Sequence, residues 1–273
     1  MPELPEVETV KRAISPALAG QCIKSVRLTR SDLRWPLPEG IAAHLTGQRC
    51  GEPRRRAKYI MVPLEDNTTL LVHLGMSGAI RLYDNKPEFH THDHFSLEME
   101  TGSWMVFSDP RRFGHLDIIS AGGEAEHPLL SHLGIEPLSN HLSGPWLSDV
   151  LRGKKTPIKS ALLDQRLIAG LGNIYVNEAL HMSGISPRRL AQTIAGKRAE
   201  KLVIAIRTVL AAAIEAGGTS LRDHVQPGGE IGYFVQRLSV YGRTSEPCLT
   251  CATPIKELRQ SGRASFYCPS CQR

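Results

Sequence analysis

The chain begins Met1-Pro2-Glu3-Leu4-Pro5-Glu6-Val7-Glu8-Thr9-Val10, where two prolines and three carboxylates accompany the start of an apolar pattern of helical spacing. Pro5 suits the first turn of a helix, because its missing N–H has no partner there and its φ is already set. Acidic side chains favour the same turn, since the N-terminus of a helix carries a partial positive charge. We therefore predict a short extended tip followed by an amphipathic helix from Pro5 to Leu18.

Helix formation does not explain Pro2 and Glu3, which points to a chemical role for them. We expect Met1 to be removed, which leaves a secondary amine at Pro2. An α-amino group has a pKa of about 8, against about 10.4 for lysine, so far more of it is free base at neutral pH. On a sugar C1′ such an amine forms an iminium, an electron sink; Glu3 and Glu6 are then candidates for proton transfer and for positioning that acid. A tail of chance composition is the alternative, and composition alone favours it.

Length and composition describe a globular protein with a polyanionic partner. The chain has 273 residues with a net charge of +6 and a pI of about 9.1. A chain of this length usually forms two domains, and its basic balance favours nucleic acid or another polyanion. Basic residues also cluster at 49–58 and at 152–159, although a solvated face explains each cluster equally well.

The sequence has no feature typical of a membrane or secreted protein. It lacks an uninterrupted apolar run of about 18 residues, and its first twenty residues are too acidic and too interrupted by proline for a signal peptide. Four of the six cysteines have a metal-type arrangement, while Cys22 and Cys50 stand alone. This usage suits a reducing compartment, so we expect a cytoplasmic protein.

Hydrophobic periodicity changes along the chain and predicts an α+β protein. Short alternating runs between turn residues extend from 49 to 119 and indicate a β-sandwich-like domain behind the N-terminal helix. From 146 to 216 the periodicity is helical, and Gly217-Gly218 ends the last helix as a C-terminal cap does. The expected strands are 22–28, 59–62, 69–72, 79–83, 94–99, 104–107 and 116–119, and the expected helices are 5–18, 41–48, 146–151, 158–167, 174–182 and 195–216. The predicted division is a β-rich domain at 1–130, a linker region at 131–152, a helical domain at 153–235 and a hairpin at 236–273.

The strongest local motif is a pair of cysteine pairs near the C-terminus. Cys248-x2-Cys251 and Cys268-x2-Cys271 are separated by 16 residues, which is the spacing of a four-thiolate zinc site. Four thiolates leave no coordination position open, so this zinc is structural. The intervening hairpin carries Arg263 among small residues, where its guanidinium can bind a phosphate bidentately. Free thiols or a redox pair are the disfavoured alternatives.

Several loops can be interpreted either as purely structural or as functional. Gly170-Leu171-Gly172-Asn173 precedes a predicted helix, where backbone N–H groups can approach a phosphate, but a turn with an Asn cap is commoner. Turns at 73–78 and 109–114 carry bulky side chains, which spacing alone assigns to the core. Alternating histidines at 90, 92 and 94 share one strand face, which weakly indicates a metal site.

Pro-Glu-Leu-Pro-Glu-Val-Glu-Thr at 2–9 resembles the N-terminal signature of bacterial formamidopyrimidine-DNA glycosylase, a DNA repair family, and the likeness extends to the last cysteine pair. It implies a base excision repair glycosylase that removes oxidised purines (8-oxoguanine, formamidopyrimidines) from duplex DNA, preferably opposite cytosine, and has AP lyase activity by β,δ-elimination. It also implies a monomer, one structural zinc and a helix–two-turns–helix second domain. A non-catalytic zinc-containing reader of damaged or bent DNA is the alternative, although such a protein has no use for the reactive N-terminus.

The resemblance also assigns catalytic roles. Pro2 is implied as the nucleophile that forms the Schiff base, and Glu3 as the acid beside it. Lys58 resembles the family's strand lysine, which faces that proline and donates a proton in β-elimination. Two neighbouring cations lower each other's pKa, which helps both to act near neutrality. Arg263 is implied to bind phosphates around the lesion and to donate the proton in the second elimination.

The remaining implied contacts are with DNA. An enzyme that everts a nucleotide must fill the space left in the stack, and the resemblance gives this task to Met76, Arg111 and Phe113, with Arg111 on the orphaned cytosine. The loop at 217–233 is implied to close over the everted base. Further implied DNA contacts are His73, His92, Lys154, Lys159, Asn173 and Tyr241.

Two positions bear on lesion preference. Ala79 stands near where some family members carry a glutamate that touches the flipped base, so base readout must depend more on loop backbone groups. Leu4 separates the chain from the related pyrimidine-specific branch, which begins Pro-Glu-Gly-Pro. Together with Arg111 and Phe113, Leu4 favours the purine-specific branch.

Overall fold

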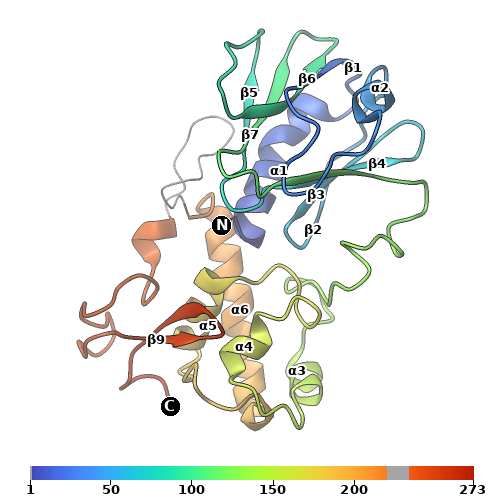
Figure 1. The fold of residues 1–273 in the computed structure, drawn as a ribbon. Coiled ribbons are helices and arrows are strands. Elements are labelled where there is room, and N and C mark those ends of the chain that lie inside the picture. The colour runs from blue at the N-terminus through green and yellow to red at the C-terminus, as the bar shows by residue number, and fades with distance from the viewer. Residues whose placement is uncertain (1, 220–233) are drawn as a thin grey trace. The chain divides into compact units, whose positions relative to one another are not determined.

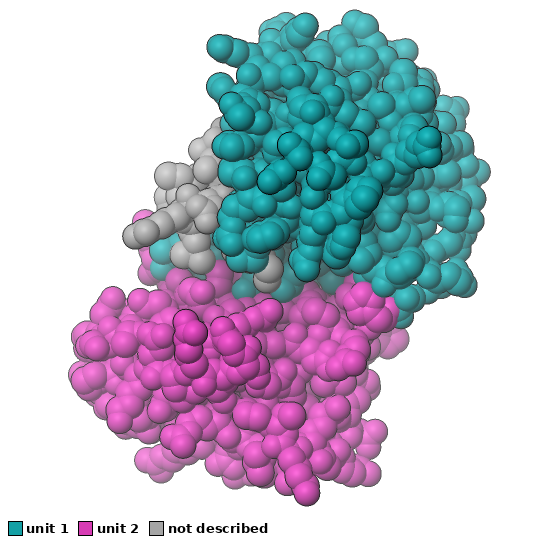
Figure 2. Space-filling view, in the orientation of Figure 1, with its two compact units in different colours: residues 1–131, 216–235 teal, residues 132–215, 236–273 magenta. Residues whose placement is uncertain are grey.

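The computed structural model describes residues 2–219 and 234–273, whose helices and strands are shown in Figure 1. The chain forms two compact units, which Figure 2 shows in teal and magenta. Unit 1 comprises Met1–Ser131 and Ala216–Val235, and unit 2 comprises His132–Glu215 and Gln236–Arg273. In the part of the chain that the structure describes, no helix has both the length and the apolar character needed to cross a membrane.

Unit 1 is organised around α1 (Leu4–Leu18), which begins one residue before its predicted start. Its apolar face is buried in one core cluster with side chains from both sheets of the unit. Burial of each large aliphatic side chain contributes about 1.5–3 kcal/mol, so this face fixes α1 against the sheets. The residues just before the helix, Pro2 and Glu3, are buried as a result.

Two four-stranded sheets form the rest of the core, and every neighbouring pair of strands is antiparallel. Side chains from both sheets meet in one core, as predicted for a sandwich-like domain. A short helix, α2 (Ile41–Leu45), ends before the predicted Gln48 because Thr46 turns extended. The first sheet has the order β1 (Ile23–Leu28), β6 (Asp93–Met99), β7 (Trp104–Ser108), β5 (Ala79–Tyr83), and the second has the order β2 (Arg54–Arg56), β3 (Tyr59–Pro63), β4 (Thr69–His73), β8 (His115–Ile119).

Unit 2 consists of helices and one hairpin. The predicted helix at 158–167 ends early, at Leu162, because the chain then turns at Asp164. The 131–152 segment contains a short helix, and the predicted domain boundaries stay predictions. The helices are α3 (Gly144–Val150), α4 (Ile158–Leu162), α5 (Asn173–Met182) and α6 (Lys197–Glu215), with 3₁₀ turns η1 (Ala191–Thr193) and η2 (Phe234–Arg237, which crosses the boundary between the units), and the hairpin strands are β9 (Lys256–Gln260) and β10 (Arg263–Tyr267).

Turn geometry at two places agrees with the sequence. Gly217 and Gly218 both have positive φ, 74° and 78°, and they follow Ala216, the first residue after α6. Ser261 and Gly262 also have positive φ, 49° and 76°, and they join β9 to β10. A two-residue hairpin turn of this kind matches the twist of the strands, and it places Arg263 at the first position of β10.

Candidate active site and zinc centre

The start of α1 is connected to the segment that leads into 220–233. The Glu3 backbone N–H donates to Glu6 Oε2 at 2.8 Å, and Glu6 Oε1 accepts both the backbone N–H and the hydroxyl of Thr219 at 2.8 Å. Gly218 has a φ of +78°, and an added Cβ would lie 3.0 Å from Glu6 Oε1. One carboxylate, that of Glu6, therefore fixes both Glu3 at the start of α1 and Thr219 at the start of the loop. Residues 220–233, the greater part of the loop predicted to close over a base, lie outside the described residues.

Lys58 lies in a two-residue turn, Ala57-Lys58, between β2 and β3. Ala57 has a φ of 52°, which is unusual for a residue with a Cβ. Arg55 stabilises this turn, because its Nη1 donates to the Ala57 carbonyl at 3.1 Å while its Nε donates to Glu8 Oε2 at 2.9 Å. Burial alone would raise the pKa of Glu8, but hydrogen bonds from basic neighbours including Arg55 hold that pKa below its ordinary value. Lys58 is 8% exposed, so a nearly buried lysine is fixed to the helix that follows Pro2 and Glu3.

His73 ends β4 and is held as a neutral imidazole. Its Nδ1 accepts the Gly75 backbone N–H at 3.1 Å, so the proton resides on Nε2. Burial lowers the pKa of His73 to about 4, and the positive charge of Lys58 acts in the same direction. The Tyr59 ring, on the neighbouring strand, lies 4.8 Å from the His73 ring. His73 therefore offers a donor, without a positive charge, near Lys58.

A single buried carboxylate, Asp109, joins the two loops that carry the predicted wedge residues. Its Oδ1 accepts the Ser77 hydroxyl at 2.6 Å and its Oδ2 accepts the Gly114 backbone N–H at 2.6 Å. Ser77 Oγ in turn accepts the Arg111 backbone N–H at 3.2 Å. The Asp109 backbone N–H also donates to the His92 carbonyl at 2.9 Å. Asp109 is fully buried, so it fixes three loops that otherwise lie apart in the sequence.

The tips of these loops are accessible. Phe113 is 38% exposed, Arg111 and His92 are exposed, and Met76 is half-buried. The Arg111 guanidinium lies 4.9 Å from the Phe113 ring centroid. A Cβ at Gly75 would overlap the backbone of Phe113, so glycine is required for the two loops to approach. Met76 and Phe113 were assigned to the core by spacing alone, and the exposure of Phe113 contradicts that interpretation for Phe113.

The alternating histidines do not form a metal site. Among the described residues, the one group of three or more potential metal ligands is the cysteine cluster. His94 instead bonds through Nε2 to the Asp109 carbonyl at 3.1 Å and is buried, while His92 is exposed. The metal interpretation of 90–94 is therefore wrong, and His92 is available for another contact.

The four cysteines of unit 2 converge as the spacing predicted. Their sulfurs all lie within 4.8 Å of one another, with Cys251 3.5 Å from Cys268 and 3.4 Å from Cys271, and Cys248 3.9 Å from Cys271. Tetrahedral zinc with Zn–S bonds of about 2.3 Å places its sulfurs about 3.8 Å apart. The residues present therefore fit one structural zinc ion with no open position.

Two predicted DNA contacts, Lys159 and Asn173, are bonded to the zinc hairpin. Lys159 is fully buried, and its ammonium donates to the Ala264 carbonyl at 2.6 Å and to Ser265 Oγ at 2.7 Å. Asn173 Nδ2 donates to the same carbonyl at 3.1 Å. Gly172, not Asn173, is the N-cap of α5, so the Asn-cap interpretation is wrong. Both side chains hold the residue next to Arg263. Because Lys159 is fully buried, its ammonium cannot reach a phosphate without a local rearrangement.

The other predicted contacts of unit 2 are at least partly accessible. Arg263 is exposed, and Lys154 and Tyr241 are half-buried. The Tyr241 backbone N–H donates to Glu178 Oε1 at 2.8 Å, together with that of Val240 at 3.0 Å. Glu178 Oε2 accepts the Ser239 backbone N–H at 2.8 Å. One carboxylate of α5 therefore fixes the segment that leads to the first zinc cysteines.

Asn177 also supports the hairpin, because its Oδ1 accepts the Phe266 backbone N–H at 2.8 Å. The sequence did not predict the residues that position these groups, which are Arg55, Ser77, Asp109, Asn177 and Glu178. Ser77 and Asp109 stood inside quoted turns, and the cue available was a polar side chain beside a glycine turn. Arg55 and Glu178 carried no distinguishing signal, because a basic run and a helical glutamate are ordinarily solvated.

Three family models match the chain in succession. They are the formamidopyrimidine-DNA glycosylase N-terminal domain at residues 1–116, the formamidopyrimidine-DNA glycosylase H2TH domain at 133–225, and the zinc finger found in FPG and IleRS at 245–273. The formamidopyrimidine-DNA glycosylase of Cereibacter sphaeroides (strain ATCC 17029 / ATH 2.4.9) is 50% identical over 283 aligned positions, which cover all of both chains.

Solved structures agree with the sequence matches. MutM in complex with DNA containing carbocyclic 8-oxo-G is 33% identical, with full coverage of both chains and a TM-score of 0.91. Lactococcus lactis Fpg in complex with DNA containing an abasic site gives the same identity, coverage and TM-score. The chain therefore belongs to the formamidopyrimidine-DNA glycosylase family of DNA repair enzymes.

Proposed function

We propose that this enzyme excises oxidised purines, 8-oxoguanine and formamidopyrimidines, from duplex DNA and cleaves the strand by β,δ-elimination through a Schiff base at Pro2. DNA glycosylase and AP lyase activities are those of its family. The observation that carries the assignment of residues is the N-terminal arrangement. Pro2 and Glu3 are buried at the start of α1, and the Glu8–Arg55 pair fixes the turn of Lys58 to that helix.

The first step is displacement of the base. With Met1 removed, the Pro2 amine attacks C1′, and the bond from C1′ to the base nitrogen breaks. Glu3 transfers a proton during departure of the base, and ring opening of the sugar gives the iminium at C1′. Glu6 accepts the Glu3 backbone N–H, so Glu6 positions Glu3 and its carboxyl group and does not itself transfer a proton.

The iminium then acts as the electron sink for strand cleavage. Loss of a proton from C2′ breaks the C3′–O bond and expels the 3′ phosphate, and a second elimination breaks the C5′–O bond and expels the 5′ phosphate. Hydrolysis of the iminium then releases the sugar remnant from Pro2, which leaves a one-nucleotide gap. Lys58 supplies a proton in the first elimination and Arg263 in the second. The low exposure of Lys58 supports this role, since it keeps the ammonium away from bulk water.

DNA is held by the accessible loop tips and by basic groups of unit 2. Met76, Arg111 and Phe113 fill the space left by the everted nucleotide, with Arg111 on the opposite cytosine. His73 and His92 contact the same strand region. Phosphate contacts come from Lys154, Tyr241 and Arg263, while Lys159 and Asn173 support Arg263 through Ala264. The zinc ion, when bound, supplies only structural support for that hairpin.

The enzyme prefers cytosine opposite the lesion, because Arg111 can bond that base; it acts as a monomer; and it works on chromosomal DNA in the bacterial cytoplasm. Ala79, at the start of β5, leaves base selection to backbone groups of the loops.

Cleavage of an end-labelled duplex tests the proposed reaction. With 8-oxoguanine opposite cytosine, we expect strand fragments that end in phosphate on both sides of the gap, and much slower cleavage opposite adenine. A duplex with guanine at the same position is the matched control. Alkali-labile but uncut strands would mean a glycosylase without the lyase step. Tight binding without base release would support a non-catalytic reader and overturn the proposal.

A further inference from the structure

Helix α5 meets the zinc segment at successive points along one face. Asn173, Asn177 and His181 are spaced four residues apart, which places them on the same side of a helix. Asn173 bonds to the Ala264 carbonyl, and Asn177 Oδ1 accepts the Phe266 backbone N–H at 2.8 Å. His181 is the last of the three, and its Nε2 lies 3.6 Å from Cys248 Sγ. The helix that begins beside Arg263 therefore ends at the metal cluster.

Cys248 needs hydrogen-bond donors more than an ordinary thiol does. It is 3% exposed, and as a zinc ligand it is a thiolate. Four thiolates carry more negative charge than one divalent ion neutralises, and a buried charge without donors is costly. The Thr250 backbone N–H, 3.5 Å away, is one donor to this sulfur. The Cys251 backbone N–H is another donor. An N–H on His181 Nε2 would add a side-chain donor, and hydrogen bonds to charged acceptors are the stronger ones.

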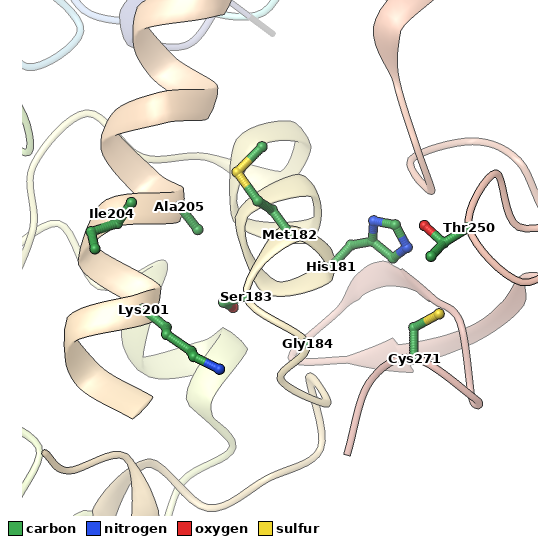
Figure 3. Close-up of a pocket in the computed structure, with 9 residues that line it drawn as sticks. All are labelled: His181, Met182, Ser183, Gly184, Lys201, Ile204, Ala205, Thr250 and Cys271. Carbon is green, nitrogen blue, oxygen red and sulfur yellow. The ribbon is translucent and has the colours of Figure 1, made fainter. Parts of the chain in front are cut away.

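The cluster also borders a cavity of about 530 Å³ that His181 and Cys271 line, together with Met182, Lys201 and Ile204. Figure 3 shows the His181 side chain projecting from α5 toward the segments that carry Thr250 and Cys271. Met182, the next residue, points away from the cysteine in the same view. A small chelator can therefore approach the cluster from this cavity, through Cys271 on the side where His181 stands.

We propose that His181 donates a hydrogen bond from Nε2 to the Cys248 thiolate, and so slows the loss of zinc and fastens the metal cluster to α5. His181 is a positioning residue in this account, not a zinc ligand. The contact is independent of the reaction at Pro2, and it concerns the structural zinc of the family to which the chain belongs.

Zinc transfer from the full-length, zinc-loaded protein to an excess of a chromogenic chelator tests the proposal. For His181→Leu we expect release about tenfold faster, at the low end of the cost of losing an outer-shell partner. His181→Gln keeps an N–H of similar reach and should release zinc at nearly the original rate. Met182→Leu, at a neighbouring position of the same cavity, is the matched control and should not change the rate.

A spectroscopic measurement separates donation from packing. In the cobalt-substituted protein, loss of a donor makes the thiolate easier to oxidise, so the sulfur-to-cobalt charge-transfer band of His181→Leu should move to lower energy while that of His181→Gln stays. Equal release rates and band positions in wild type and His181→Leu would overturn the proposal. Release by His181→Gln as fast as by His181→Leu would also overturn it, because packing would then explain the effect.

Discussion

Arg111 in unit 1 and Arg263 in unit 2 are exposed arginines next to left-handed residues, yet the molecule supports them in different ways. Arg112 has a φ of 57° and Gly262 a φ of 76°. The Arg111 loop depends on one buried carboxylate, Asp109, which joins it to Ser77 and Gly114. The Arg263 hairpin is held by a metal cluster and by several side chains of α4 and α5. In unit 1 a single carboxylate therefore holds the loop of Arg111, whereas in unit 2 a zinc site and several side chains together hold the hairpin of Arg263.

Zinc removal is expected to have the largest effect, because the hairpin has few apolar side chains with which to fold. Structural zinc contributes on the order of 10 kcal/mol to such a segment, so chelation should abolish tight binding to abasic-site DNA. The strand signal in circular dichroism should persist, since both four-stranded sheets belong to unit 1. Binding that returns on addition of zinc is the control. Unchanged affinity without the ion would show that unit 2 does not depend on its cluster.

Asp109→Ala should have the largest effect of a single substitution in unit 1. It leaves the Gly114 N–H without its acceptor in a buried site, which we expect to lower the free energy of unfolding by about 3 kcal/mol. Cleavage of 8-oxoguanine DNA should fall as well, because the loops of Met76, Arg111 and Phe113 lose their connection. Urea denaturation and cleavage assays measure the two effects. Asp84→Ala, at an exposed position, is the control. If the two variants have equal stability and equal cleavage activity, Asp109 does not hold the loops together.

Lys159→Met tests whether the unit 2 lysine supports the hairpin or binds phosphate. Loss of its bonds to Ala264 and Ser265 should cost about 2 kcal/mol of stability and weaken DNA binding. Because no phosphate contact is lost, the slope of log affinity against log salt should stay as it is. Arg263→Ala, in contrast, should reduce that slope by about 1. A reduced slope for Lys159→Met would restore the direct contact.

Acidification should lower the free energy of unfolding, in part through protonation of His73 in the unfolded chain. In the folded chain the pKa of His73 is about 4, below the ordinary value of 6.5. Between these two pH values the unfolded chain takes up a proton on His73 that the folded chain does not. Stability is therefore lost as pH falls, by about 2 kcal/mol between pH 7 and pH 5. His73→Gln should show a correspondingly smaller loss in urea denaturation at the two pH values. Parallel losses in both proteins would contradict a His73 that stays neutral in the folded chain.

Local patterns predicted much of this molecule. The cysteine spacing gave the metal cluster, periodicity gave α1, α5 and α6, and alternation gave seven of the eight strands of unit 1, with β2 missed because an Arg-Arg-Arg strand has no apolar alternation. The catalytic roles of Pro2, Glu3, Lys58 and Arg263 stay predictions that depend on the family resemblance.

The supporting residues escaped prediction because their partners are distant in sequence. Ser77 meets Asp109 across 32 residues and Lys159 meets Ser265 across 106, so no local window contains either pair. The buried position of Lys159 was also unpredictable, since a lysine in a basic run is ordinarily solvated. Motifs thus predicted which side chains contact DNA, whereas contacts between distant parts of the sequence hold those side chains in place.

Borohydride trapping on a duplex with 8-oxoguanine opposite cytosine tests whether the Pro2 amine is the nucleophile. Reduction converts the iminium into a stable covalent bond between protein and DNA, and peptide mapping locates it. We expect an adduct on the amine of Pro2, with Met1 absent. An adduct on Lys58 would keep the lyase but contradict the assigned nucleophile, and tight binding without any adduct would contradict the Schiff-base mechanism.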